Sequence, residues 1–295
     1  MTQTTEDNPC VRRLGPTFGG ELSGIRLSTD TLAAHAGAIH RAFLDSKVLV
    51  LRDQQITPAL FSAFGALFGE PDPHHVIAMR HPEQPNLTVL SNQDEPGRKP
   101  QAKYFGAGWH SDYSYKAVPA AATMLLATEV PDEGGDTLFA DMEAAFAALP
   151  EERKSELRRL RVRHQYRWSP DRTDPWARWT FLSERERAAT PEVVHPLVRR
   201  HPETGRESLM IAPRVIGSVI GIEGMEPAAS DALIDDLMRH AVSERFVYRH
   251  RYRPWDIIVW DNRCTLHCAT TDTLAADKVR RMLRITIRGL PPIPA

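Results

Sequence analysis

The chain has 295 residues, and its 37 Lys and Arg nearly balance its 38 Asp and Glu, which leaves a formal net charge of −1. This balance provides no excess of either sign for nucleic acid or an anionic membrane surface, so neither is expected as a partner. The hydrophobic fraction of 42% is ordinary for a soluble protein with a buried core.

The N-terminal segment 1–11 is polar and acidic and lacks the apolar core of a signal peptide. No later segment approaches the roughly 18 uninterrupted apolar residues of a membrane helix. We therefore predict a cytoplasmic protein in which Cys10, Cys264 and Cys268 stay free thiols. Cys264 and Cys268 alone are too few soft ligands for a structural zinc site.

Alternating and apolar runs predict strands along the whole chain, with helical patterns between some of them. In chain order we predict helix 32–44, strand 47–51, helix 58–68, strands 87–90 and 122–126, helices 142–149 and 150–159, strands 160–166 and 208–211, helix 227–241, and strands 246–252, 256–260 and 282–287. Strands and helices do not alternate regularly, which favours an antiparallel barrel or sandwich with helices outside. Because no repeat or long linker interrupts the pattern, residues 1–295 are expected to form one domain.

His110 and Asp112 lie two positions apart in the segment GWHSDY (108–113). On a strand, residues i and i+2 face the same side, so this imidazole and this carboxylate would converge. A second histidine from a distant strand would complete the 2-His-1-carboxylate site of non-haem Fe(II) oxygenases, which leaves coordination positions open. The pair alone is weak support, because it arises by chance among surface polar residues.

His267 is the candidate for the second histidine, because it follows an apolar strand and a polar turn in segment 257–267. Three other histidines, His164, His195 and His201, lie beside arginines or a proline and are predicted to be surface or turn residues. Four more histidines fall in charged stretches or in a helical pattern: His240, His250, His35 and His40.

Three arginines near the C-terminus, Arg280, Arg284 and Arg288, are evenly spaced by four. On an extended strand they would share one face. Burying guanidinium groups costs free energy unless anions pair with them, so this spacing is compatible with a binding site for anionic ligands. A solvated edge strand is the alternative that this pattern leaves open.

Taken together, these residues resemble the TauD/TfdA family, the taurine and 2,4-dichlorophenoxyacetate dioxygenases. Further matches occur in order along nearly the whole chain: LGP (14–16), GI (24–25), VLVLRDQ (48–54), FGEP (68–71), WHSD (109–112), GGDT (134–137), HPLV (195–198) and WDNR (260–263). Segment 246–267 is closer to the aryloxyacetate branch than to the taurine branch. The resemblance implies an α+β fold with a double-stranded β-helix (jelly-roll) core and flanking helices.

The resemblance also implies which residues form the site. His110, Asp112 and His267 would hold Fe(2+), while Thr137 and Arg280 would bind the distal carboxylate of 2-oxoglutarate. Because Arg284 lies slightly farther from His267 than the family pattern implies, either Arg280 or Arg281 could face 2-oxoglutarate.

For the primary substrate, Arg284 matches a position that binds an anionic group, and His74 matches a histidine that assists it. Tyr113, Tyr166 and Val215 fall near positions that line the family's substrate pocket, with ordinary core packing as the alternative. The loop 93–107 is either a lid over the substrate or simply solvated.

The implied activity is that of an Fe(2+)- and 2-oxoglutarate-dependent dioxygenase, which consumes O2, releases succinate and CO2, and hydroxylates a small, anionic substrate such as a carboxylate, sulfonate or aryloxyalkanoate. The same scaffold could serve a desaturase or another tailoring oxygenase. Asp112 argues against a halogenase, which needs that carboxylate position vacant. A divalent-metal hydrolase with the same ligands, or a binding protein without activity, are alternatives from other classes. Whether the chain forms a homo-oligomer is left open.

Overall fold

A seven-stranded sheet is the largest element of the computed structural model, which describes residues 9–74, 77–93, 106–166, 191–213, 219–275 and 277–295. Its strands follow the order β1 (Cys10–Arg13), β2 (Gly20–Ser23), β3 (Val48–Leu51), β13 (Ile257–Asp261), β5 (Ala120–Glu129), β15 (Arg281–Arg288) and β4 (Thr88–Ser91). Neighbouring strands are antiparallel except for β2 and β3, which are parallel. Strands from both ends of the chain therefore meet in one sheet.

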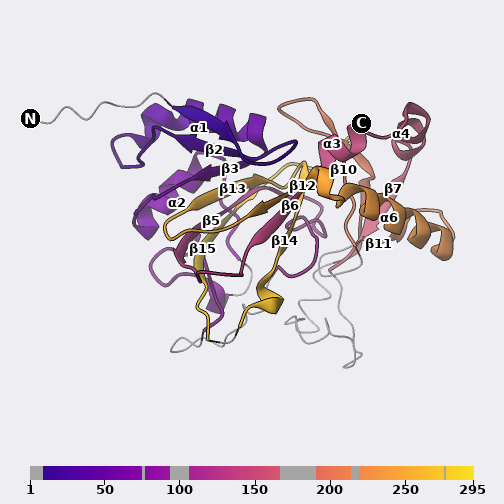
Figure 1. The fold of residues 1–295 in the computed structure, drawn as a ribbon. Coiled ribbons are helices and arrows are strands. Elements are labelled where there is room, and N and C mark those ends of the chain that lie inside the picture. The colour runs from indigo at the N-terminus through magenta and orange to yellow at the C-terminus, as the bar shows by residue number, and fades with distance from the viewer. Residues whose placement is uncertain (1–8, 75–76, 94–105, 167–190, 214–218, 276) are drawn as a thin grey trace, which may run out of the picture.

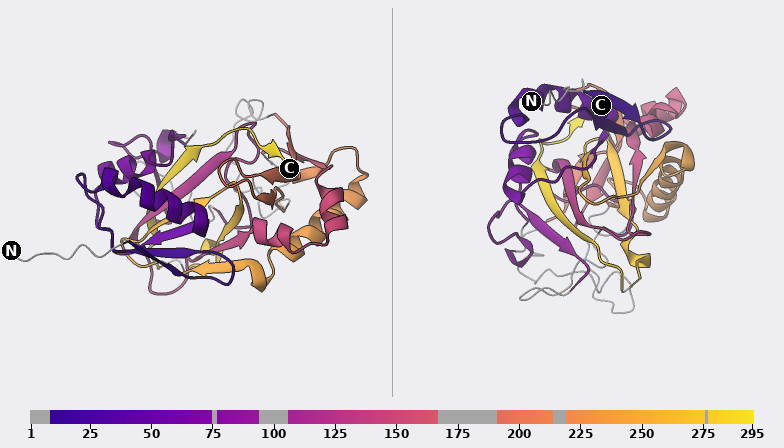
Figure 2. Two further views of the ribbon diagram at one scale, coloured as in Figure 1. Left: turned by 90° about the horizontal axis from the view of Figure 1, so that it is seen from above. Right: turned by 60° about the vertical axis from the view of Figure 1, so that its left-hand side comes forward.

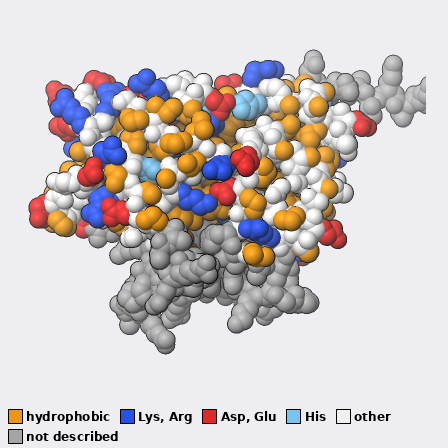
Figure 3. All heavy atoms as spheres, turned by 180° about the vertical axis from the view of Figure 1, so that it is seen from behind, with side chains coloured by type: hydrophobic (Ala, Val, Ile, Leu, Met, Phe, Trp, Pro, Cys, Tyr) orange, Lys and Arg blue, Asp and Glu red, His pale blue; other side chains and the backbone are white. Residues whose placement is uncertain are grey.

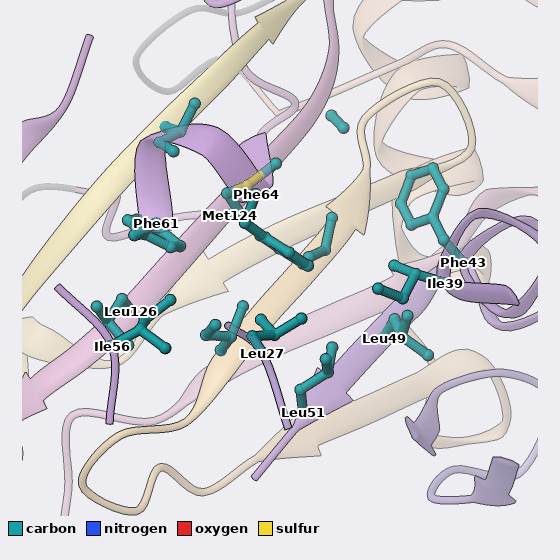
Figure 4. Packing of buried hydrophobic residues seen from close by; sticks show 14 of the residues in the cluster. Leu27, Ile39, Phe43, Leu49, Leu51, Ile56, Phe61, Phe64, Met124 and Leu126 are labelled. Carbon is teal, nitrogen blue, oxygen red and sulfur yellow. The ribbon is translucent and has the colours of Figure 1, made fainter. Parts of the chain in front are cut away.

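The two faces of this sheet bury different sets of side chains, as the period of two in a strand requires. One face packs on helices α1 (Leu32–Ser46) and α2 (Pro58–Ala66) through residues such as Leu49, Met124 and Leu126, which meet Phe43 and Phe64 (Figure 4). The opposite face carries the alternate residues, including Val50, Leu125 and Trp260.

A three-stranded sheet, β12 (Val247–His250), β6 (Thr137–Asp141) and β14 (Thr265–Ala269), covers this opposite face. Phe139 on β6 and Tyr248 on β12 belong to the same buried cluster as Val50 and Trp260. The candidate residues Thr137 and His267 lie on β6 and β14, in the space between the two sheets.

A third core lies at the other end of the molecule, where α3 (Met142–Ala147), α4 (Glu151–Leu157) and α6 (Pro227–Ala241) gather, away from α1 and α2 (Figures 1 and 2). Two small sheets join them: β11 (Val219–Ile222), β7 (Arg161–His164) and β8 (Val193–Pro196), and β10 (Glu207–Leu209), β9 (Val198–Arg200) and β16 (Ile293–Pro294). On the face seen in Figure 3, acidic and basic side chains of the described residues are interspersed among apolar ones.

The helices begin where the local sequence favours a start. Thr57 caps α2 by accepting the Leu60 N–H at 3.2 Å, with Pro58 in the first turn, and Asp141 caps α3 by accepting the Ala144 N–H at 3.0 Å. α1 ends at Ser46, and the next residue, Lys47, has a φ of 62° and leads the chain directly into β3.

All predicted helices are confirmed within a few residues, and every predicted strand overlaps an observed one, which confirms the α+β class. The sequence patterns missed several short strands, among them β6 and β14. One structural expectation was wrong: His110 forms only an isolated bridge and Asp112 lies in the turn that follows, so the pair does not converge through strand alternation.

Candidate active site

His110, Asp112 and His267 converge although Asp112 is not on a strand. The backbones of His110 and His267 exchange two hydrogen bonds of 2.9 Å, which brings the imidazole rings to a centroid distance of 4.1 Å. Asp112 Oδ1 lies 3.9 Å from His110 Nε2, and Asp112 Oδ2 lies 3.7 Å from His267 Nε2. The three potential ligand atoms all lie within 4.8 Å of one another, which suits a single metal ion.

The protonation of these groups also suits metal binding. Burial lowers the pKa of His110 and, more strongly, that of His267, so both rings are neutral near pH 7. The Nδ1–H of His110 donates to the Gly108 carbonyl at 2.9 Å, which leaves the lone pair of Nε2 toward Asp112. Burial alone would raise the pKa of Asp112, but Arg284 and the two histidines outweigh it and lower that pKa, so Asp112 is a carboxylate.

A small cavity, about 40 Å³ in volume, lies beside these three residues. Apolar side chains, among them Leu125 and Trp260, form part of its wall. Its polar lining, apart from the three residues themselves, comprises Thr137, Arg280 and Arg284. The residues predicted to bind iron and 2-oxoglutarate therefore meet at one cavity.

Arg280 is 93% buried (7% exposed), yet among the described residues no carboxylate lies within ion-pairing distance of its guanidinium group. Its Nε donates to the Gly135 carbonyl at 2.9 Å, and its guanidinium lies 5.3 Å from the centre of the Tyr252 ring. Burial lowers the pKa of Arg280, as expected for a charge without a counter-ion. Such a group is prepared for an anionic ligand.

The GGDT segment explains how Arg280 fits. Gly135 has a φ of 68°, and a Cβ built there would lie 3.0 Å from Arg280 Cδ. Only glycine meets both requirements without strain. Thr137 follows directly at the start of β6, and its hydroxyl lies 2.9 Å from that of Tyr252.

The evenly spaced arginines near the C-terminus do not all lie at the cavity. Arg280 and Arg284 are buried and line the cavity, whereas Arg281 is not among its lining residues. The prediction that Arg288 shares their face was wrong: the register shifts between Ile287 and Arg288, and Arg288 is exposed.

Of the residues predicted to bind the substrate, Tyr113 lies close to Arg284. Arg284 Nη2 is 2.7 Å from Asp112 Oδ1, and the Arg284 guanidinium is 5.9 Å from the centre of the Tyr113 ring. Tyr113 is buried, has a φ of 57°, and carries Lys116 Nζ at 3.7 Å from its ring centre. His74 is buried, but neither it nor Tyr113 lines the small cavity.

Tyr166 packs edge to face on Tyr115, which in turn packs on Tyr113. Val215 and most of the loop 93–107 lie outside the described residues, so neither prediction about them is tested.

The expectation that His164, His195 and His201 are surface or turn residues was wrong with respect to exposure, because all three are buried. His201 belongs to a second cluster with Asp261 and Cys264. Asp261 Oδ2 already accepts from His201 Nε2 at 2.9 Å and from Arg263 Nη2 at 2.7 Å. This cluster is a hydrogen-bonded ion-pair network, and a metal would have to displace both donors.

The cavity and its donor set define a class of protein, a metal-dependent enzyme with two histidines, one carboxylate and room for further ligands. Residues 11–286 match the family described as "Taurine catabolism dioxygenase TauD, TfdA family". The chain therefore belongs to the TauD/TfdA family, and it is a 2-oxoglutarate-dependent dioxygenase that uses Fe(2+), 2-oxoglutarate and O2.

Individual relatives agree with this assignment. The chain is 34% identical over 281 residues to pentalenolactone F synthase of Streptomyces arenae, which covers 91% of this chain and 92% of that protein. It is also 34% identical over 284 residues to the alpha-ketoglutarate-dependent 2,4-dichlorophenoxyacetate dioxygenase of Cupriavidus pinatubonensis, covering 92% and 94%. The crystal structure of AAD-2 in complex with Mn(II) and N-oxalylglycine superimposes with a TM-score of 0.76 at 29% identity, covering 97% and 99% of the two chains.

The family membership favours an oxygenase over the hydrolase and the inactive binding protein. Among the described helices, none combines the length and the apolar character needed to cross a membrane.

Proposed function

We propose that His110, Asp112 and His267 hold the Fe(2+) and that Thr137 and Arg280 bind the distal carboxylate of 2-oxoglutarate. The observation that supports this assignment is one cavity lined by the three potential metal ligands and by Arg280, which is buried and has no carboxylate partner among the described residues. When bound, Fe(2+) with 2-oxoglutarate and O2 supplies the oxidising power that converts a substrate C–H bond to C–OH and releases succinate and CO2.

The protein's own residues prepare this reaction. The neutral histidines and the ionised Asp112 need no proton release before metal binding, because their pKa values are already low. The planar fork of Arg280 matches a carboxylate in bidentate geometry, and the Thr137 hydroxyl can add a third hydrogen bond. Leu125 and Trp260 limit water at the cavity wall.

We further propose that the primary substrate is a small anion whose charged group binds Arg284, with His74 and Tyr113 beside it. Arg284 is a buried cation at the cavity, and its planar guanidinium group has the geometry that pairs with a carboxylate or sulfonate. The relative named for 2,4-dichlorophenoxyacetate supports an aryloxyalkanoate-like acid. Hydroxylation next to an ether oxygen would cleave such a compound, whereas a carbon without a heteroatom neighbour would give an alcohol or a desaturated product.

Three structural predictions accompany this function. The two facing sheets support a double-stranded β-helix (jelly-roll) core within one domain of residues 1–295. Cys10, Cys264 and Cys268 form no disulfide with one another, which supports a cytoplasmic location. Nucleic acid is not an expected partner, and a homo-oligomer stays open.

Succinate release tests the proposed function. The protein, loaded anaerobically with Fe(2+) and 2-oxoglutarate, is mixed with O2 and a panel of small carboxylates, sulfonates and aryloxyalkanoates, each paired with its neutral amide or ester. We expect an anion to stimulate succinate release, its neutral partner to fail, and Arg284→Met to lose the stimulation. Equal stimulation by a neutral analogue would contradict the role of Arg284, and equal activity of His267→Ala would contradict the metal site.

A further inference from the structure

A buried hydrogen-bond network contacts Asp112 through its backbone N–H and its Oδ2, whereas Arg284 contacts Oδ1. The centre of the network is Asn262, a fully buried residue directly after β13. Asn262 Oδ1 accepts from the Asp112 backbone N–H at 3.2 Å and from Trp260 Nε1 at 3.1 Å. Both partners can only donate, so they fix which atom of the Asn262 amide is the oxygen.

The orientation of the amide then determines the direction of the next hydrogen bond. Asn262 Nδ2 lies 2.9 Å from Thr123 Oγ1, and as an amide nitrogen it can only donate. The Thr123 hydroxyl therefore accepts from Asn262 and has its own proton free. Asp112 Oδ2 lies 2.6 Å from the same hydroxyl and accepts that proton. Each of these hydrogen bonds has one possible donor and one possible acceptor, so the direction of every bond is determined.

The backbone of Asn262 is fixed as well. Its N–H donates to the Ala121 carbonyl at 2.9 Å, and its carbonyl accepts from the Ser111 hydroxyl at 2.9 Å and from the buried guanidinium of Arg199. Asn262 thus contacts both Asp112 and the residue before it. Because Asp112 lies in a turn rather than a strand, these contacts replace the support that a regular ladder would give.

We propose that Thr123 and Asn262 are positioning residues that hold the Asp112 carboxylate in its metal-binding orientation. Thr123 engages Oδ2 and thereby restricts rotation of the carboxylate, while Asn262 sets the direction of the Thr123 hydroxyl. The inference rests on the proposed function, in which Asp112 is a metal ligand. Groups that orient a ligand in this manner commonly raise metal affinity by about 10–100-fold.

The alternative is that the network only satisfies buried polar groups and contributes to folding. Thr128 provides a matched control, because it lies on the same strand, β5, and its hydroxyl donates to the Arg281 carbonyl at 2.9 Å. Loss of the Thr128 hydroxyl removes one hydrogen bond from β5, whereas loss of the Thr123 hydroxyl removes the bonds to Asp112 and to Asn262. Only loss of the Thr123 hydroxyl should alter metal binding.

The test measures anaerobic binding of Fe(2+) alone, by competition with a chromogenic chelator, to wild type, Thr123→Val, Thr123→Ser and Thr128→Val. We expect Thr123→Val to bind Fe(2+) about 10–100-fold more weakly, with Thr123→Ser and Thr128→Val close to wild type. The visible absorption of the Co(2+)-loaded protein should change in Thr123→Val and be restored in Thr123→Ser, since a purely structural hydroxyl would leave the ligand field unaltered.

The proposal is overturned if folded Thr123→Val binds Fe(2+) as tightly as Thr128→Val, or if Thr123→Ser is as weak as Thr123→Val. Failure of the proposed function gives a different result: in that case His267→Ala would bind Fe(2+) as tightly as wild type. If His267→Ala loses the metal and Thr123→Val does not, the metal site stands and the positioning role is wrong.

Discussion

Replacing Arg280 by Met should separate 2-oxoglutarate binding from folding. The substitution removes the buried guanidinium and leaves an apolar side chain of similar length. If the fork makes two charge-assisted hydrogen bonds to the distal carboxylate, each worth about 1.5–3 kcal/mol, the loss is about 3–6 kcal/mol. The dissociation constant for 2-oxoglutarate should therefore rise by more than about 100-fold. Anaerobic titration of the Fe(2+)-loaded protein, followed by the visible absorption of the complex, measures it.

Stability provides the internal check on this experiment. Because Arg280 has no carboxylate partner among the described residues, removing its charge should not lower the melting temperature of the cofactor-free protein by much. Arg288→Met is the matched control, since Arg288 is the last residue of β15, the strand that begins directly after Arg280, but is exposed. A change in 2-oxoglutarate affinity of less than about five-fold in folded Arg280→Met, roughly 1 kcal/mol, would refute the assignment.

Three further outcomes are expected. Gly135→Ala should lower the free energy of unfolding by about 1–3 kcal/mol and weaken 2-oxoglutarate binding, because the new Cβ would lie 3.0 Å from Arg280 Cδ at a φ of 68°. Denaturant unfolding measures the first effect, and the titration described above measures the second. Unchanged values would contradict the close packing of Gly135 against Arg280. Asp261→Asn should lower the free energy of unfolding by about 3–5 kcal/mol in the same assay, because the substitution breaks the buried ion pair with Arg263. A loss below about 1 kcal/mol would contradict a stabilising role of this pair. Burial, together with the nearby charges, lowers the pKa of His164 from 6.5 to about 3. As the pH falls, the unfolded chain therefore binds a proton at His164 before the folded chain does. The stability that the neutral His164 contributes is fully present above pH 6.5 and falls by about 2 kcal/mol by pH 5. His164→Leu should flatten this pH dependence of the free energy of unfolding, and an unchanged slope would refute the prediction.

Long elements were predictable from the sequence because their patterns are strong. α1 and α6 repeat apolar residues at helical spacing, and β13 is an apolar run bounded by polar turns. β6 and β14 were missed because both are short and mix Thr, Asp, His and Cys with apolar residues while staying mostly buried. A strand buried on both faces, like β6 with Phe139 in one core and Ala140 in another, shows no alternation that sequence periodicity can detect.

The site was less predictable from pattern than from resemblance. The spacing of His110 and Asp112 suggested a strand, but a turn held through Asn262 brings the two side chains together, and that support depends on tertiary contacts. Neighbouring residues also misled: His201 lies close to arginines in sequence, yet its ring is buried against Asp261. Arg288 leaves the shared face because of a register shift that no spacing rule reveals.

A crystal structure of the protein with Mn(2+) and 2-oxoglutarate tests the central claim most directly. We predict one Mn(2+) bound by His110 Nε2, His267 Nε2 and an oxygen of Asp112, with the distal carboxylate of 2-oxoglutarate on Arg280 and Thr137. Metal bound instead at His201, Asp261 and Cys264, or a distal carboxylate held by Arg284 rather than Arg280, would contradict it.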